Sequence, residues 1–235
     1  MTTLLLATRN EHKVEEIRAI LGGSFRCLCL HDFIGVPKVS EDADSFAGNA
    51  TKKAIELAHW LTMDDTRFQT KNSKLDFVLA DDSGLKVDAL NGAPGIHSAR
   101  FAALDTKKPG NSPDADNNAK LLRLMKNVPA DKRTARFRCV IALTAVPEGT
   151  IESSSPVCFA DKFQTEIFDG VCTGKILAAP RGANGFGYDP LFVPDGYDQT
   201  FAELSDEIKN QISHRSKALG KLKAYLEGRP AAARS

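Results

Sequence analysis

The sequence predicts an α/β protein with a mixed, elongated central sheet, flanked by helices and drawn into two lobes with an active-site cleft between them. Short apolar runs alternate with segments whose apolar residues recur at helical spacing. Two longer apolar segments, residues 134–146 and 156–168, follow each other late in the chain and suit an antiparallel hairpin. No repeat and no clean linker divides the chain, so we expect residues 1–235 to form one domain with a frayed tail over 229–235.

The chain begins with a strand and a helix. Residues 3–7 are a short apolar run, which predicts a strand. The helix after it begins at about Asn10 and stops at Gly22, because glycine commonly ends a helix. Its apolar residues recur at helical spacing and are Val14, Ile17, Ile20 and Leu21.

The same alternation continues along the chain. Residues 25–33 predict a second strand, and residues 44–61 an alanine-rich helix capped by Asp44 or Ser45. Residues 114–128 and 213–228 predict two later helices. The side chains expected to face inward are Leu121, Leu122, Leu124 and Met125 in the first of these and Leu219, Leu222, Tyr225 and Leu226 in the second.

Composition excludes several classes of function. The net charge of +1 gives no large field for nucleic acid or an anionic membrane, and no apolar run approaches the roughly 20 residues of a membrane span. The first ten residues are too short and weakly charged for a secretory signal, so we expect a cytoplasmic protein. Five scattered cysteines and five histidines show no spacing typical of a zinc site.

Residues 7–13, Ala-Thr-Arg-Asn-Glu-His-Lys, fall where the first strand turns into the first helix. The unpaired backbone N–H groups and the positive end of the helix dipole face this loop. Lys13 lies in the first turn, where the same dipole mildly disfavours a cation unless an anion docks there. The segment is therefore either an ordinary capped helix with a solvated lysine or a cradle for a polyphosphate.

A run of acidic residues separates two predicted strands, residues 75–80 and 85–90. Asp81 and Asp82 would point to opposite faces if the strand continued, so the two carboxylates need separate roles. One alternative is a polar Asx turn. The other is a magnesium ligand, because Mg²⁺ takes one or two protein carboxylates with phosphates and water, and Glu41 offers a second carboxylate.

Residues 179–192 combine three glycines with Phe186, Tyr188 and Asp189. Glycines let the backbone approach a ligand, and an aromatic face can stack a base. The segment is either a platform for a base or a glycine-rich hairpin whose Phe186 joins the core. Further on, a basic cluster at a predicted helix start suits an anion or a base carbonyl, or is simply a charged helix face: Lys209, His214, Arg215 and Lys217.

Together, five separated motifs resemble the inosine triphosphate pyrophosphatase family, also called the Ham1 or noncanonical purine NTP pyrophosphatase family. The resemblance runs from residue 4 to about 226. The motifs are Thr8-x-Asn10-x-x-Lys13, Ala80-Asp81-Asp82-Ser83-Gly84-Leu85, Gly92-Ala93-Pro94-Gly95-Ile96 with Ser98-Ala99-Arg100, Phe186-Gly187-Tyr188-Asp189-Pro190 and Ser213-His214-Arg215.

The resemblance implies hydrolysis of ITP, dITP and XTP to the monophosphate and pyrophosphate with Mg²⁺, by a homodimer. From the charge and composition we expect no nucleic acid or membrane as partner. It implies that Asp82 takes a proton from the attacking water and that Glu41 and Asp82 bind the metal. Asn49 and Lys53 also fall at family positions. The substrate-binding residues it implies are Thr8, Arg9, Asn10, Glu11, His12, Lys13 and Ser83 toward the phosphates, and Phe186, Gly187, Tyr188, Asp189, Lys209, His214 and Arg215 toward the base.

Two points concern the chemistry of this site. We expect Asp82 to be ionised near neutral pH, because its ordinary acidity and an adjacent cation favour the charge. Gly48 stands where the family often has glutamate, which removes one potential carboxylate near the metal. The loop over 62–76 and the turn over 147–156 also look longer than usual. Two alternatives remain, a pyrophosphatase for other modified nucleotides and a nucleotide-binding regulator without turnover.

Overall fold

The computed structural model describes residues 1–63, 75–106, 109–147 and 163–228. Within these ranges six strands form one sheet in the order β2-β1-β3-β4-β5-β6. The sheet is mixed, because β1 is parallel to β2 and β3 whereas β5 and β6 are antiparallel. The elements are β1 (Thr2–Leu6), α1 (Glu11–Leu21), β2 (Phe25–Cys29), α2 (Phe46–Thr62), β3 (Phe77–Val87), α3 (Ala103–Thr106), α4 (Asp114–Leu124), β4 (Thr134–Ala145), β5 (Thr165–Ile176), β6 (Phe192–Pro194), α5 (Asp206–Ile212) and α6 (His214–Glu227). The predicted α/β class is confirmed.

The chain divides into two compact units. The first comprises Met1–Asp82, Val140–Asp169 and Ala218–Ser235, and the second comprises Ser83–Cys139 and Gly170–Lys217. The backbone therefore passes from one unit to the other inside β3, directly after the acidic pair.

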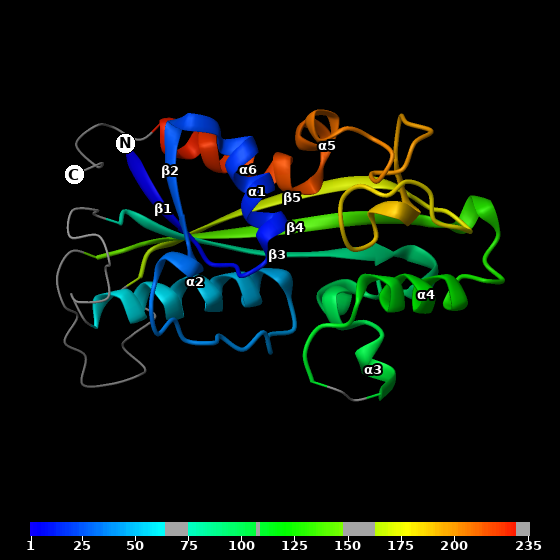
Figure 1. Cartoon of the computed structure of the whole chain (residues 1–235), viewed down its shortest axis with the longest axis horizontal. Coiled ribbons are helices and arrows are strands. Elements are labelled where there is room, and N and C mark those ends of the chain that lie inside the picture. The colour runs from blue at the N-terminus through cyan, green and yellow to red at the C-terminus, as the bar shows by residue number, and fades with distance from the viewer. Residues whose placement is uncertain (64–74, 107–108, 148–162, 229–235) are drawn as a thin grey trace. The chain divides into compact units, whose positions relative to one another are not determined.

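In the first unit, β1 lies between β2 and β3, and the two connecting helices cover opposite faces of these strands. Right-handed crossovers that run in opposite directions along the sheet, from β1 to β2 through α1 and from β2 back across β1 to β3 through α2, produce this arrangement. Figure 1 shows α2 on one side of the strands and α1 and α6 on the other. The carboxyl end of β1 is thus a topological switch point, the place where open α/β sheets usually bind ligands.

Helix α1 begins and ends where the sequence predicted. The side chain of Asn10 accepts a hydrogen bond from the backbone N–H of Lys13 and so caps the first turn. Gly22 follows the helix with a positive φ of 65°, which a residue with a side chain rarely adopts. Helix α2 is capped by Ser45, one of the two residues proposed from sequence.

The prediction of two strands separated by an acidic turn is wrong. One continuous strand, Phe77–Val87, runs through Asp81 and Asp82, whose exposed fractions are 2% and 6%. The Asx-turn alternative fails with it. Because β3 has a neighbour on each side in the sheet, the ladder of backbone hydrogen bonds overrides the local turn preference of an Asp-Ser-Gly sequence.

Other predicted boundaries also shift. Strand β2 stops at Cys29, since Leu30–Asp32 form a turn in which Asp32 accepts from the Cys29 N–H. The late hairpin uses Thr165–Ile176 as its second strand rather than 156–168, and residues 156–162 lie outside the described residues. The short elements α5 and β6 were not predicted, whereas α6 occupies nearly the predicted range and buries Leu219, Leu222 and Leu226.

The second unit packs around its own apolar core. Leu121 in α4 and Met125, which directly follows this helix, are fully buried, but Leu124 is 45% exposed, so the prediction that Leu124 faces inward is wrong. Figure 1 shows α4 and α5 on opposite sides of the strands of this unit. Aromatic residues from three segments join the core, namely Phe137, Phe192 and Phe201. No helix among the described residues is both long and apolar enough to cross a membrane.

Candidate functional site

The loop that follows β1 is fixed to β3 at the switch point. The N–H of Ala7 donates to the Leu79 carbonyl at 2.8 Å. Thr8 Oγ1 then accepts from the Asn10 N–H at 3.2 Å, and Asn10 Oδ1 accepts from the Lys13 N–H at 3.2 Å. These bonds hold the start of α1 beside the acidic pair of β3, where the backbone N–H groups of a helix start favour an anion.

Lys13 does not extend into solvent. Its Nζ lies 2.9 Å from Asp81 Oδ1, and the Asp81 side chain is fully buried. The alternative of a solvated lysine is therefore wrong. Because an unpaired buried carboxylate is costly, the pair holds Lys13 at the loop and compensates the charge of Asp81.

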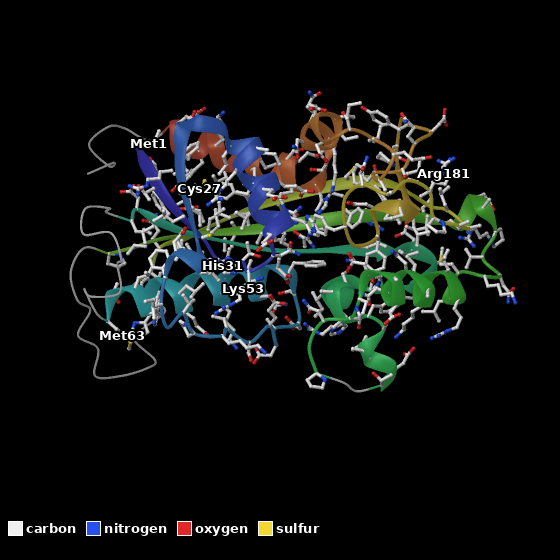
Figure 2. All side chains as sticks on the ribbon, viewed as in Figure 1. Met1, Cys27, His31, Lys53, Met63 and Arg181 are labelled. Atoms are coloured by element: carbon white, nitrogen blue, oxygen red, sulfur yellow. The ribbon has the colours of Figure 1, made fainter. Side chains whose placement is uncertain are left out.

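Asp82 is held from α2. Asn49 Nδ2 donates to Asp82 Oδ2 at 3.0 Å, while Asn49 Oδ1 accepts from the Ala43 N–H at 3.0 Å. One turn further along α2, Lys53 Nζ donates to the Asp81 carbonyl at 2.6 Å and to Glu41 Oε1 at 2.9 Å. Figure 2 labels Lys53 on this helix. We call Lys13, Glu41, Lys53, Asp81 and Asp82, together with Asn49, the phosphate-side group.

The pKa of Asp82 is raised to about 6. Burial of the carboxyl group is the largest cause, and Glu41 raises the pKa further, whereas Lys53, Lys13 and Asn49 lower it. The expectation of ordinary acidity is thus wrong, because desolvation outweighs both lysines. At pH 7 a group with this pKa is still ionised in about nine molecules of ten, so the carboxylate can act as a base.

The phosphate-side group fits a hard metal ion that shares its ligands with the substrate. Glu41 and Asp82 are near enough for the charge of one to raise the pKa of the other, and a cation between them would relieve that repulsion. Among the described residues no three or more His, Cys, Asp or Glu side chains form a metal cluster. Glu41 and Asp82 could each give a carboxylate oxygen to a hard metal ion, and such an ion commonly completes its ligands with water.

Gly48, which stands where the family often has glutamate, has little room for a side chain. A Cβ added to Gly48 would lie 2.8 Å from the Cβ of Ala43 and 3.0 Å from Ser45 Oγ. The loop before α2 thus packs against the bare backbone of Gly48. A larger residue there would displace this loop, which contacts Asn49 through the Ala43 N–H.

In the second unit, the loop over 185–189 folds around the buried carboxylate of Asp189. Asp189 Oδ2 accepts from the Phe186 N–H at 3.0 Å and from Lys209 Nζ at 2.7 Å. Lys209 Nζ also lies 4.9 Å from the centre of the Phe186 ring. Asp189 therefore shapes the loop from inside and orients Lys209.

Phe186 is half-buried and does not join the core, which rules out the hairpin alternative for this segment. Tyr188 is the aromatic residue that enters the core, where its hydroxyl donates to the Ser98 carbonyl at 2.9 Å and burial raises its pKa. The guanidinium carbon of Arg215 lies 5.9 Å from the Phe186 ring centre. Phe186 is thus flanked by two cationic side chains, Lys209 and Arg215.

Of two further predicted residues, Ser83 contacts this cluster and His214 packs against an aromatic residue of the core. An Arg215 nitrogen donates to Ser83 Oγ at 3.4 Å, so Ser83 belongs to the same cluster as Arg215. His214 is buried and stacks on Phe137, with ring centres 4.8 Å apart. We call Ser83, Phe186, Asp189, Lys209 and Arg215 the base-side group.

Three predicted residues stand apart from both groups. Arg9, Glu11 and His12 are exposed at the start of α1. Arg9 donates to the Val36 carbonyl at 3.2 Å, and His12 lies 3.9 Å from Glu15. Their side chains therefore lie at the surface beside the loop, where the backbone N–H groups of a helix start favour an anion.

Sequence reasoning gave no role to Asp114 and Asn118, which contact Gly187 of the base loop. Their spacing of four residues on a helix is a signal that they share a face, but it does not show which loop that face meets.

Comparisons with known proteins agree over nearly the whole chain. The model of the Ham1 family matches residues 4–225. A dITP/XTP pyrophosphatase from Desulforamulus reducens is 46% identical over 224 residues, 95% of this chain and 94% of that protein. One from Geobacter sulfurreducens is 44% identical over 227 residues, 96% of this chain and 97% of that protein.

Solved structures give the same result. The Ham1 protein of Staphylococcus aureus is 35% identical with a TM-score of 0.72, covering 97% of this chain and 99% of that one. A HAM1 protein from Coxiella burnetii is 34% identical with a TM-score of 0.73, covering 97% of this chain and all of that one.

Proposed function

Because this chain belongs to the Ham1 family, we propose that it hydrolyses deaminated purine nucleoside triphosphates, namely dITP, XTP and ITP, to the monophosphate and pyrophosphate. The relatives named dITP/XTP pyrophosphatase support this substrate class. The observation that carries the chemistry is the buried Asp81 and Asp82 pair, with Lys13 bonded to one carboxylate and the charges of both Lys13 and Lys53 acting on the other.

In this proposal the phosphate-side group neutralises the triphosphate and activates water. Hydrolysis of a phosphoanhydride develops charge on several oxygens, so two lysines and a helix start are suitable stabilisers. Asp82 accepts the proton of the attacking water, and Asn49 holds its carboxylate in place. When bound by Glu41 and Asp82, magnesium would supply further charge neutralisation.

The base-side group selects the purine. Hypoxanthine and xanthine present an acceptor at O6, whereas adenine presents an amino donor at that position. Lys209 and Arg215 are donors close to the Phe186 ring, on which a base can stack. A donor that meets the adenine amino group is unfavourable, so ATP and dATP are rejected.

The proposal extends to the setting of the enzyme. The single catalytic domain over residues 1–235 that the sequence predicts is part of this proposal. A cytoplasmic homodimer, with no nucleic acid or membrane as partner, is the expected form. Sedimentation of the purified protein tests the dimer.

The test is release of pyrophosphate from dITP, XTP, ITP, dATP and dGTP, with and without magnesium. We expect turnover of the first three with magnesium and at least a hundredfold loss in Asp82→Asn. Equal turnover by this variant would contradict the role of Asp82. Preference for a modified pyrimidine would favour the alternative substrate class, and binding of dITP without turnover would favour a regulator.

A further inference from the structure

We propose that Asp114 and Asn118 of α4 are positioning residues for base recognition. Both form hydrogen bonds with the backbone of Gly187 and thereby fix the position of the neighbouring Phe186 ring. This inference rests on the function proposed above and deepens its base-side site. Asp114 Oδ2 accepts from the Gly187 N–H at 2.6 Å, and Asn118 Nδ2 donates to the Gly187 carbonyl at 2.9 Å.

These two hydrogen bonds use both the backbone N–H and the backbone carbonyl of Gly187. Gly187 has a positive φ of 63°, a conformation that turns its N–H and its carbonyl away from a regular strand or helix. Asp114 and Asn118 are four residues apart on α4, so their side chains lie on one face of the helix and reach the same short segment. The bond to Asp114 is charge-assisted, which makes it the stronger of the two.

Helix α4 is itself firmly held, which makes it a suitable anchor. Leu121 and Met125 are fully buried in the core of the unit. Asn117, also buried, accepts from the Ala102 N–H at 2.9 Å and donates to the Ala99 carbonyl at 3.3 Å. A loop attached to this helix therefore inherits a fixed position.

The three residues that follow Phe186 are then each fastened to a different element. Gly187 is bonded to α4, Tyr188 to the Ser98 carbonyl and Asp189 to Lys209. The backbone of Phe186 is held within the loop, because its N–H donates to the Asp189 carboxylate and its carbonyl accepts from the Asp189 N–H. Its ring is half-buried and lies beside Lys209 and Arg215, where we expect it to meet the base. Because Lys209 and Arg215 flank this ring, its position sets how a stacked base meets its hydrogen-bond donors.

Loss of the hydrogen bonds to Gly187 should affect base recognition and leave the chemical step unchanged. Asp114 is exposed and Asn118 lies outside the apolar core, so their removal leaves that core intact. Asp82 and both lysines of the phosphate-side group belong to the other unit. A loosened Phe186 weakens the hydrogen bonds that dITP makes and dATP does not, so discrimination between them should fall.

The experiment measures kcat and KM for dITP and dATP with saturating magnesium in Asp114→Ala and Asn118→Ala. We expect a rise of about tenfold in KM for dITP, a kcat within about twofold of wild type, and a fall of about fivefold or more in the dITP to dATP ratio of kcat/KM. Asp114→Asn keeps an oxygen acceptor for the Gly187 N–H and should restore most of the lost affinity.

The matched control is Asp116→Ala, which removes an exposed carboxylate from the same first turn of α4. It should leave KM and the substrate ratio unchanged. Should Asn118→Ala fail to fold, Asn118→Asp has the same shape and places an acceptor against the Gly187 carbonyl, so it should raise KM to a similar extent.

Each outcome has a distinct meaning. A lower kcat with unchanged KM and unchanged substrate ratio would show a merely structural role and overturn the inference. An equal effect of Asp116→Ala would overturn it as well. If wild type hydrolyses dITP and the variants match it, the inference alone fails; if wild type does not hydrolyse dITP, the proposed function fails and the inference with it.

Discussion

Replacing Asp82 by asparagine should stabilise the protein at pH 8 while it removes activity. The folded-state pKa of this carboxyl is about 6, against an ordinary value of 3.8. The difference of about two units corresponds to about 3 kcal/mol at 1.36 kcal/mol per unit. Since the folded state binds the proton more tightly than the unfolded state, the charged carboxylate lowers stability above pH 6 and has little effect below about pH 4.

Asparagine has the shape of the protonated acid and still offers an oxygen to Asn49. We therefore expect Asp82→Asn to raise the free energy of unfolding by about 1 to 3 kcal/mol at pH 8 and by much less at pH 4. Urea unfolding of both proteins at the two pH values measures the difference. A variant that is less stable than wild type at pH 8 would refute the conclusion that desolvation dominates at Asp82.

Three other perturbations test separate parts of the site. Because Asp82 must lose its proton to act as a base, kcat/KM for dITP should be half-maximal near pH 6 and about a tenth of its plateau at pH 5; a flat profile between pH 5 and 8 would contradict this. Lys13→Ala leaves the buried Asp81 without this partner and should cost about 3 kcal/mol in urea unfolding, whereas Lys52→Ala, which removes an ion pair at the surface, should have a much smaller effect. Gly48→Glu should lower the melting temperature by several degrees and reduce activity, because the added side chain meets Ala43 and Ser45; unchanged activity and stability would show that the loop yields freely.

The sequence was sufficient for features that depend on local signals. Asn10 and Gly22 bound α1 because an N-cap side chain and a positive φ are properties of single residues. The acidic pair was recognised as chemically special, but its surroundings were misread. Asp-Ser-Gly favours a turn in isolation, and only the neighbouring strands, which come from distant parts of the chain, keep β3 extended.

Long-range contacts also decided which site residues act together. Nothing in the order of residues shows that Lys13 reaches Asp81, 68 positions away, or that Asp114 reaches Gly187, 73 positions away. The burial that raises the pKa of Asp82 is likewise a property of the packed unit, and reasoning from the free amino acid gave ordinary acidity instead.

The placement of the acidic pair suggests why the base is built on a strand. A carboxylate on a free loop would be solvated, with a pKa near 4 and little affinity for a proton at neutral pH. Burial within β3 brings the pKa of Asp82 close to the working pH, and Asn49 fixes the direction of its carboxylate. The same burial of a charged carboxylate destabilises the fold. The gain in unfolding free energy in Asp82→Asn would therefore measure the cost of keeping Asp82 as a buried base.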